Sequence, residues 1–224
     1  MSAKEWIRAD ELWMAGRGNL EAEDQCFFYY VRDARGWRAS HDNDEMWDLK
    51  HDPIEHPPGT RPYEHKMRAI DGCGAHLADF LASIYPSFNG VQQVLVPMPT
   101  SIPRGEPGYD DRMDRICDIA AGLAPWVSVS RVLDSASTVQ KSHMGGTRDV
   151  EQIYSNTVCE RIPQGPLAKV AILVDDVLTT GAHYAACKRR LLEANPHIGL
   201  VIGAFMAIYV RPGDHGYGTS VRDR

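Results

Sequence analysis

Short apolar runs alternate with longer segments of helical spacing along most of this chain. Within residues 63–85 and again within 111–123, apolar residues recur every three or four positions, which predicts two amphipathic helices. The apolar runs between such segments are too short for helices and predict buried strands. This alternation indicates βαβ units, so we expect an α/β fold with a mainly parallel sheet flanked by helices.

The same criteria place the remaining elements of the predicted core. Strands are expected at residues 91–96, 127–133, 153–158, 170–174 and 199–209, and a third helix at 180–194. The FFYYV run at 27–31, followed by a turn at 32–36 and Trp37, predicts a hairpin. A proline-rich stretch at 53–62 marks a boundary. We therefore divide the chain into residues 1–61, a core at 62–210 and a flexible tail at 211–224.

Residues 172–184, ILVDDVLTTGAHY, join a predicted strand, two acids, a turn and a helix. Asp175 and Asp176 follow the strand at its carboxyl end, where open α/β sheets bind ligands. Free N–H groups and hydroxyls at residues 179–181 can hold a phosphate, and glycine lets the backbone approach closely. The carboxylates can bind the diol of a sugar, and the turn beside them can bind a phosphate. Together they predict a site for ribose 5-phosphate. Two acids after a strand are also compatible with a metal site, a solvated strand end or an ordinary strand-to-helix turn.

This segment resembles the phosphoribosyl diphosphate (PRPP) signature of type I phosphoribosyltransferases, and VDDVLTTGA is closest to the ComF-type branch. The resemblance implies a Rossmann-like type I phosphoribosyltransferase core in which Asp175 and Asp176 contact the ribose and Mg²⁺. It also implies that the following turn holds the 5-phosphate. The residues expected at that phosphate are Leu178, Thr179, Thr180, Gly181 and Ala182.

A second region, residues 94–113, resembles the loop that binds the pyrophosphate of the donor in this family. The ComF-type branch usually carries Asn-Gln where this chain has Asp110 and Asp111, which adds negative charge beside an anionic ligand. A proline- and glycine-rich turn that caps the next helix is the alternative. The residues that the resemblance assigns to the pyrophosphate are Met98, Pro99, Thr100, Ser101 and Arg104.

A third region, residues 134–154, resembles the flexible catalytic loop of the family. Such a loop closes over the donor, excludes water and brings cations to the leaving pyrophosphate. The candidate catalytic residues are Lys141, His143 and Arg148. A long surface loop with solvated charges is the alternative interpretation.

The charge and hydrophobicity of the sequence limit the kinds of partner that the chain is expected to bind. The net charge of −6 gives no reason to expect nucleic acid, and no apolar run reaches membrane-spanning length. The N-terminal residues do not resemble a signal peptide, and the five cysteines are widely spaced with no CxxC pair. We therefore expect a cytoplasmic protein with reduced thiols.

These expectations combine into one function with an alternative. The chain is expected to be a Mg²⁺-dependent phosphoribosyltransferase that moves ribose 5-phosphate from PRPP to an unidentified nitrogen acceptor and releases pyrophosphate. Residues 1–61 would form a hood over the site, or an appendage through which the chain forms a homodimer or binds another protein. The alternative is a non-catalytic protein on this fold that senses PRPP or a nucleotide, or that binds a partner.

Overall fold

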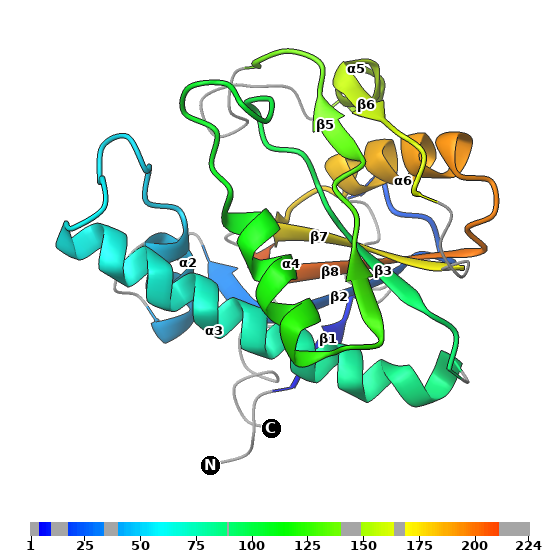
Figure 1. Cartoon of the computed structure of the whole chain (residues 1–224), viewed down its shortest axis with the longest axis horizontal. Helices are drawn as coiled ribbons and strands as arrows, with labels where there is room; N and C mark the ends of the chain where they lie inside the picture. The colour runs from blue at the N-terminus through cyan, green and yellow to red at the C-terminus, as the bar shows by residue number, and fades with distance from the viewer. Residues whose placement is uncertain are drawn as a thin grey trace.

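The structure is a computed structural model that describes residues 5–9, 18–33, 40–88, 90–139, 149–163 and 169–210 (Figure 1). Its helices are α2 (His41–Leu49), α3 (Arg61–Ile84), α4 (Arg112–Leu123), α5 (Val150–Asn156) and α6 (Ala182–Ala194), with a short 3₁₀ helix, η1 (Tyr85–Phe88). Its strands are β1 (Ile7–Arg8), β2 (Gln25–Asp33), β3 (Gln93–Pro97), β4 (Val127–Val129), β5 (Leu133–Ser135), β6 (Thr157–Cys159), β7 (Val170–Leu178) and β8 (Leu200–Val210). The predicted tail, residues 211–224, lies outside the described residues.

Six strands form the central sheet in the order β1-β2-β8-β7-β3-β4. β2, β8, β7, β3 and β4 run parallel to one another, whereas β1 pairs antiparallel with β2. β5 and β6 form a separate antiparallel pair. The predicted α/β architecture with a mainly parallel sheet is therefore confirmed, and it is compatible with a Rossmann-like fold.

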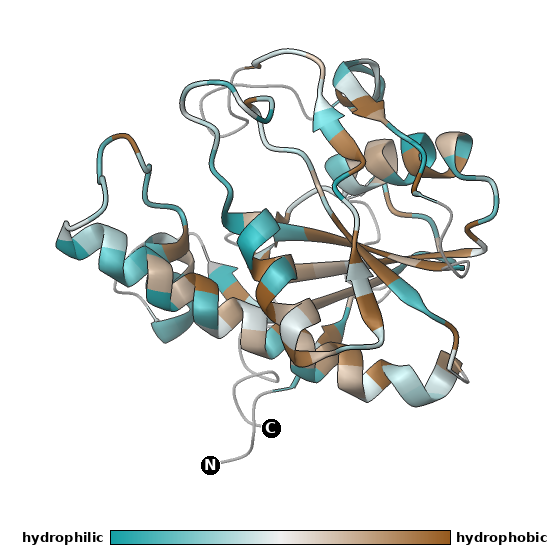
Figure 2. Cartoon of the chain, in the orientation of Figure 1, coloured by the Kyte–Doolittle hydropathy of each residue, from teal (hydrophilic) through white to brown (hydrophobic). Residues whose placement is uncertain are grey.

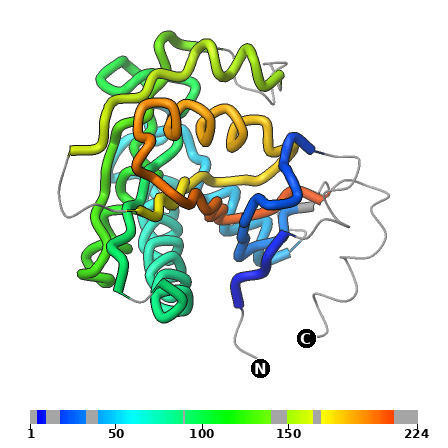
Figure 3. The backbone as a smooth tube through the Cα atoms, turned by 90° about the vertical axis from the view of Figure 1, so that its right-hand side faces the viewer, coloured from blue at the N-terminus to red at the C-terminus, as the bar shows by residue number. Residues whose placement is uncertain are grey.

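Helices cover both faces of this sheet (Figures 1 and 3). α2, α3 and α4 pack on one face, where Ile70 and Leu77 are fully buried. α6 packs on the other face through Tyr184 and Leu191, which are also fully buried. Figure 2 shows hydrophobic colour on the central strands and mixed colour along the helices, as expected for strands covered on both sides.

Local sequence explains the start of α3 and its close contact with α4. The Thr60 hydroxyl accepts a hydrogen bond from the backbone N–H of Tyr63, and Pro62 occupies the first turn, where its missing N–H costs nothing. Gly74 lies where a Cβ would come within 2.5 Å of Ile119 on α4. This glycine is therefore needed for helix packing.

Two segments predicted as single strands have a different secondary structure. Residues 150–156 form α5 instead of the start of a strand, because the Asp149 carboxylate caps the helix by accepting from the N–H of Gln152. The strand expected at 153–158 is reduced to β6. The strand expected at 127–133 is divided into β4 and β5, which belong to different sheets.

The described part of residues 1–61 joins the core. β2 lies between β1 and β8 in the central sheet, so the predicted strand at 27–31 is confirmed. Arg32 and Asp33 pair with β8 and extend this strand instead of beginning the turn expected at 32–36, and residues 34–37, with Trp37, lie outside the described residues. The Trp6 indole N–H donates to the carbonyl of His76 at 2.8 Å, and its ring lies 4.8 Å from the ring of Phe80. Part of the predicted hood or appendage thus belongs to the sheet, and the division at residue 61 stays a prediction.

Candidate functional site

The two acids of the segment 172–184 lie within β7, which continues to Leu178 instead of ending at Val174. Successive side chains of a strand point to opposite faces. Asp175 accordingly meets His183 of α6, whereas Asp176 meets residues from the α2 and α4 side of the sheet. The structure therefore brings the two carboxylates to the end of the same strand but gives each a different set of partners.

Asp176 is buried between two cations. Its Oδ2 lies 3.0 Å from the Nζ of Lys50, the residue that caps the carboxyl end of α2, and 2.5 Å from the Nη2 of Arg112 on α4. Burial alone would raise the pKa of this carboxyl, but Lys50 and Arg112 outweigh that effect and hold it below its usual range. Asp176 is therefore ionised.

Asp110 belongs to the same cluster. Its carboxylate accepts from the Nζ of Lys66 at 2.7 Å and from Arg112. The Lys66 side chain is only 3% exposed, and burial lowers its pKa although Asp110 acts in the opposite direction. The negative charge that looked out of place in the sequence is therefore neutralised by α3 and α4.

We call Lys50, Lys66, Arg112, Asp110 and Asp176 the charge cluster. Three cations and two carboxylates leave one net positive charge at the carboxyl end of β7. Lys50 and Lys66 are functional candidates that the sequence analysis missed, because both lie in segments with no motif and reach the site only through the packing of α2 and α3.

The turn after β7 has the geometry expected of an anion site. Gly181, the N-cap of α6, is in the left-handed region with φ of 78° and offers no side-chain cap, and the Thr180 hydroxyl accepts from the N–H of Ala182 at 3.4 Å. The first-turn N–H groups of such a helix favour an anion. Thr179 and Thr180 are partly exposed, whereas Leu178 and Ala182 are buried, so the last two could offer only backbone groups.

Residues 18–24 lie across this turn. The backbone N–H of Asn19 donates to the carbonyl of Thr180 at 2.8 Å, and a Cβ on Gly181 would come within 2.7 Å of Leu20. Asp24 pairs with Lys188 of α6 at 2.6 Å. The N-terminal segment therefore covers one side of the predicted phosphate turn.

His183, in the first turn of α6, lies beside Asp175. Its Nδ1 is 3.0 Å from Oδ2 of Asp175. Burial opposes protonation, but the neighbouring Cys187 and Asp175 outweigh it and raise the pKa of the imidazole well above its ordinary value. The sequence contained a signal for this residue, since His183 follows the turn glycine by two positions.

The predicted pyrophosphate loop follows β3. The N–H of Met98 donates to the carbonyl of Val174 in β7 at 2.9 Å, and the hydroxyl of Thr100 donates within the loop to the carbonyl of Ile102. Ser101 accepts at its carbonyl from the N–H of Val139, within the region 134–154 that was expected to hold the catalytic loop. The structure therefore brings Met98 beside β7 and Ser101 beside Val139.

Arg104, which was expected to contact the pyrophosphate, is hydrogen-bonded to groups of the protein. Its guanidinium donates to both carboxylate oxygens of Asp114, at 3.2 and 3.1 Å, and to the carbonyl of Leu133 at 2.5 Å. Through these bonds Arg104 connects the predicted pyrophosphate loop to α4 and β5. Contact of this side chain with a pyrophosphate stays a prediction, as does that of Pro99.

The three candidate catalytic residues, Lys141, His143 and Arg148, lie outside the described residues. The described chain on either side of them ends at Val139, which is bonded to Ser101, and resumes at the cap of α5. The start of this loop is therefore adjacent to the predicted pyrophosphate loop.

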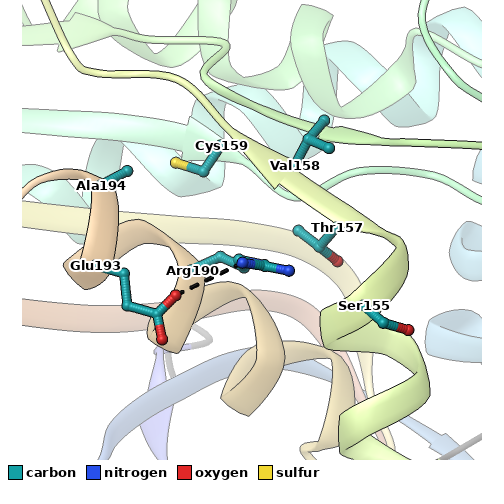
Figure 4. A pocket seen from close by; sticks show the side chains of 7 residues that line it. All are labelled: Ser155, Thr157, Val158, Cys159, Arg190, Glu193 and Ala194. Carbon is teal, nitrogen blue, oxygen red and sulfur yellow. Dashed lines mark ion pairs between the residues drawn. The ribbon is translucent and has the colours of Figure 1, made fainter.

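A cavity of about 450 Å³ lies elsewhere, between α5, β6 and the carboxyl-terminal part of α6 (Figure 4). Its charged residues, Arg190 and Glu193, pair with each other at 3.7 Å. The predicted site lies at the opposite end of α6, so we do not place the donor in this cavity.

Direct binding of a magnesium ion does not fit the two acids as they are arranged. Asp176 is already held by two cations, and Asp175 accepts from the N–H of Asp176 at 2.8 Å and pairs with His183. Across the described part of the chain, no cluster of three or more His, Cys, Asp or Glu side chains could hold a metal ion. Magnesium is therefore considered below only as part of the substrate.

Among the described residues, none of the helices is both long and apolar enough to cross a membrane. All five cysteines are free thiols. Neither the comparison with protein-family models nor that with curated proteins found a match. The functional argument therefore rests on the site itself.

Proposed function

We propose that this protein binds the magnesium complex of PRPP at the carboxyl end of β7 and transfers its ribose 5-phosphate to a nitrogen acceptor, releasing pyrophosphate. The observation that carries the proposal is the combination of two acids near the end of β7 with the start of α6, where the N-cap is a glycine in the left-handed region. The first matches a ribose diol and the second matches a phosphate. The type I phosphoribosyltransferase fold is part of the same proposal.

The charges of the site support an anionic donor. The charge cluster has one net positive charge, and the first turn of α6 adds the positive end of a helix dipole. The donor would lie across the end of β7, with its phosphate at Thr179–Gly181 and its diphosphate near residues 98–101. Preorganised cations would then stabilise the charge that develops on the leaving pyrophosphate.

Calorimetric titration with PRPP and magnesium tests the donor site. Asp175→Asn is the sharper variant, because Asp175 is partly exposed, whereas changing Asp176 would leave Lys50 without its carboxylate and Arg112 with Asp110 alone. We expect the native chain to bind and Asp175→Asn to bind at least about tenfold more weakly, the value of one charge-assisted hydrogen bond. Asp118→Asn, on the exposed side of α4, is the matched control. Absence of binding to the folded native chain would refute the proposal.

A second candidate, a PRPP or nucleotide sensor without turnover, is favoured by one observation. Arg104, the cation expected at the pyrophosphate, is held by Asp114 and Leu133 instead. A sensor needs the binding residues but no stabilisation of a leaving group. PRPP binding without pyrophosphate release, tested with a panel of nucleobases and ammonia, would support the sensor over the transferase.

A further inference from the structure

The position of Lys50 is fixed by the packing of α2. The Ser40 hydroxyl caps this helix by accepting from the N–H of Asn43, and Met46 and Leu49 are fully buried. Lys50 follows at once as the C-cap, with two of the preceding carbonyls bonded to its N–H. Its four-carbon side chain reaches Asp176 of β7 from an element that is 126 positions away in the sequence.

The two cations on Asp176 are held differently. Arg112 donates to Asp110 as well as to Asp176, and its side chain is 18% exposed. Lys50 is 34% exposed and meets Asp176 at 3.0 Å, a longer contact than the 2.5 Å of Arg112. Arg112 is therefore clamped between two carboxylates, whereas Lys50 is the cation that can leave Asp176 without breaking the rest of the cluster.

We infer that Lys50 is a donor-binding residue supplied by α2: the ribose hydroxyls of PRPP replace it on Asp176, and its ammonium group then binds the diphosphate of the same donor. This inference rests on the proposed function and assigns a residue to it. Lys50 becomes the residue through which the N-terminal region takes part in the site.

When the ribose hydroxyls replace Lys50 on Asp176, each group involved keeps a hydrogen-bond or charge partner. Hydroxyl groups donate to the Asp176 carboxylate in place of the ammonium, while Arg112 stays as its counter-ion. The released ammonium lies in a partly buried place, where an unpaired charge is costly, so it requires a new anion. PRPP provides one in its diphosphate, whereas ribose 5-phosphate has the same diol but no diphosphate.

This difference between the two ligands defines the experiment. The full chain, its Lys50→Gln variant and the control Lys169→Gln, which makes the same charge change at the amino end of β7, are titrated with PRPP plus magnesium and with ribose 5-phosphate. We expect Lys50→Gln to bind PRPP at least about tenfold more weakly, because one charge-assisted contact is lost. It should bind ribose 5-phosphate at least as tightly as the native chain, because a competitor for Asp176 has been removed.

A purely structural role would not separate the ligands. Equal weakening of both, unchanged PRPP binding, or loss of the fold in Lys50→Gln would overturn the inference, since an exchangeable cation is not needed for stability. Lys50→Arg should retain most of the PRPP affinity, and its failure to do so while folded would also overturn it. A native chain that does not bind PRPP refutes the proposed function itself, whereas native binding that Lys50→Gln leaves intact refutes only the role of Lys50.

Discussion

Replacing Asp110 by asparagine should lower the free energy of unfolding more than the same replacement of an exposed aspartate. Asp110 is the carboxylate that neutralises Lys66, whose ammonium donates to it at 2.7 Å and to the carbonyl of His51 at 2.7 Å. The substitution preserves the size of the side chain and removes its charge. Lys66, only 3% exposed, then keeps a buried charge with a neutral partner.

The magnitude follows from this burial. Removing one partner of a buried ion pair typically costs about 3–5 kcal/mol, because the other charge remains buried and uncompensated. Arg112 loses one of its two carboxylates as well, but Asp176 still pairs with it. We therefore expect the free energy of unfolding to fall by roughly 3 kcal/mol at neutral pH, near the lower end of that range.

Urea unfolding measured at several pH values tests both the size of this loss of stability and its cause. Burial already holds the pKa of Lys66 below its unfolded value, and loss of Asp110 should lower it further. Because the unfolded chain then binds more protons than the folded one, raising the pH toward the unfolded lysine pKa should recover part of the lost stability. Asp111→Asn, the exposed neighbour with the same charge change, should stay within about 0.5 kcal/mol of the native chain. A loss below about 1 kcal/mol for Asp110→Asn, or no recovery with pH, would refute the reasoning.

Three further predictions concern the turn, the histidine and the thiols. Gly181→Ala should lower the free energy of unfolding in urea by roughly 1–3 kcal/mol, because φ is 78° there and the new Cβ meets Leu20; an unchanged midpoint would contradict this. The ion pair of His183 with Asp175 stabilises the fold fully below the unfolded histidine pKa of 6.5 and loses this effect as the pH rises through the higher folded value. The stability difference between the native chain and His183→Gln should therefore shrink with rising pH, and a difference that grows would exclude the pair. Buried thiols should not react with an aromatic disulfide reagent until urea unfolds the chain, because burial raises their pKa, and rapid labelling of the folded chain would argue against it. These thiols belong to Cys26, Cys73 and Cys117.

Periodicity predicted the elements whose signals are local and long. α3 and β8 lie within two residues of their expected bounds at each end, because their apolar spacing extends over more than ten residues. α2 was not predicted, since Met46 and Leu49 are its main buried apolar residues and provide too short a pattern. The α5 segment was misread because its helix depends on a single cap, Asp149.

The candidate site was predictable only where its residues share one segment. The acids and the turn glycine are neighbours in sequence, so their proximity follows from the strand and helix around them. The partners of Asp110 could not be predicted, because Lys66 is 44 residues away and comes close only when α3 packs on α4. The opposite directions of Asp175 and Asp176 were also missed, since they depend on β7 continuing past both acids.

The parallel pairing of β2 with β8 also has a consequence for how the chain is made. Gln25 of β2 pairs with Ile202 of β8, and β8 separates β1 and β2 from the other strands of the sheet. On the ribosome, β1 and β2 therefore emerge long before β8, and the apolar side chain of Phe28 has no complete core to enter until then. Closure of the sheet must wait for the last described strand, so we expect slow folding that is completed late in translation or after it, with a need for protection from aggregation in the interval.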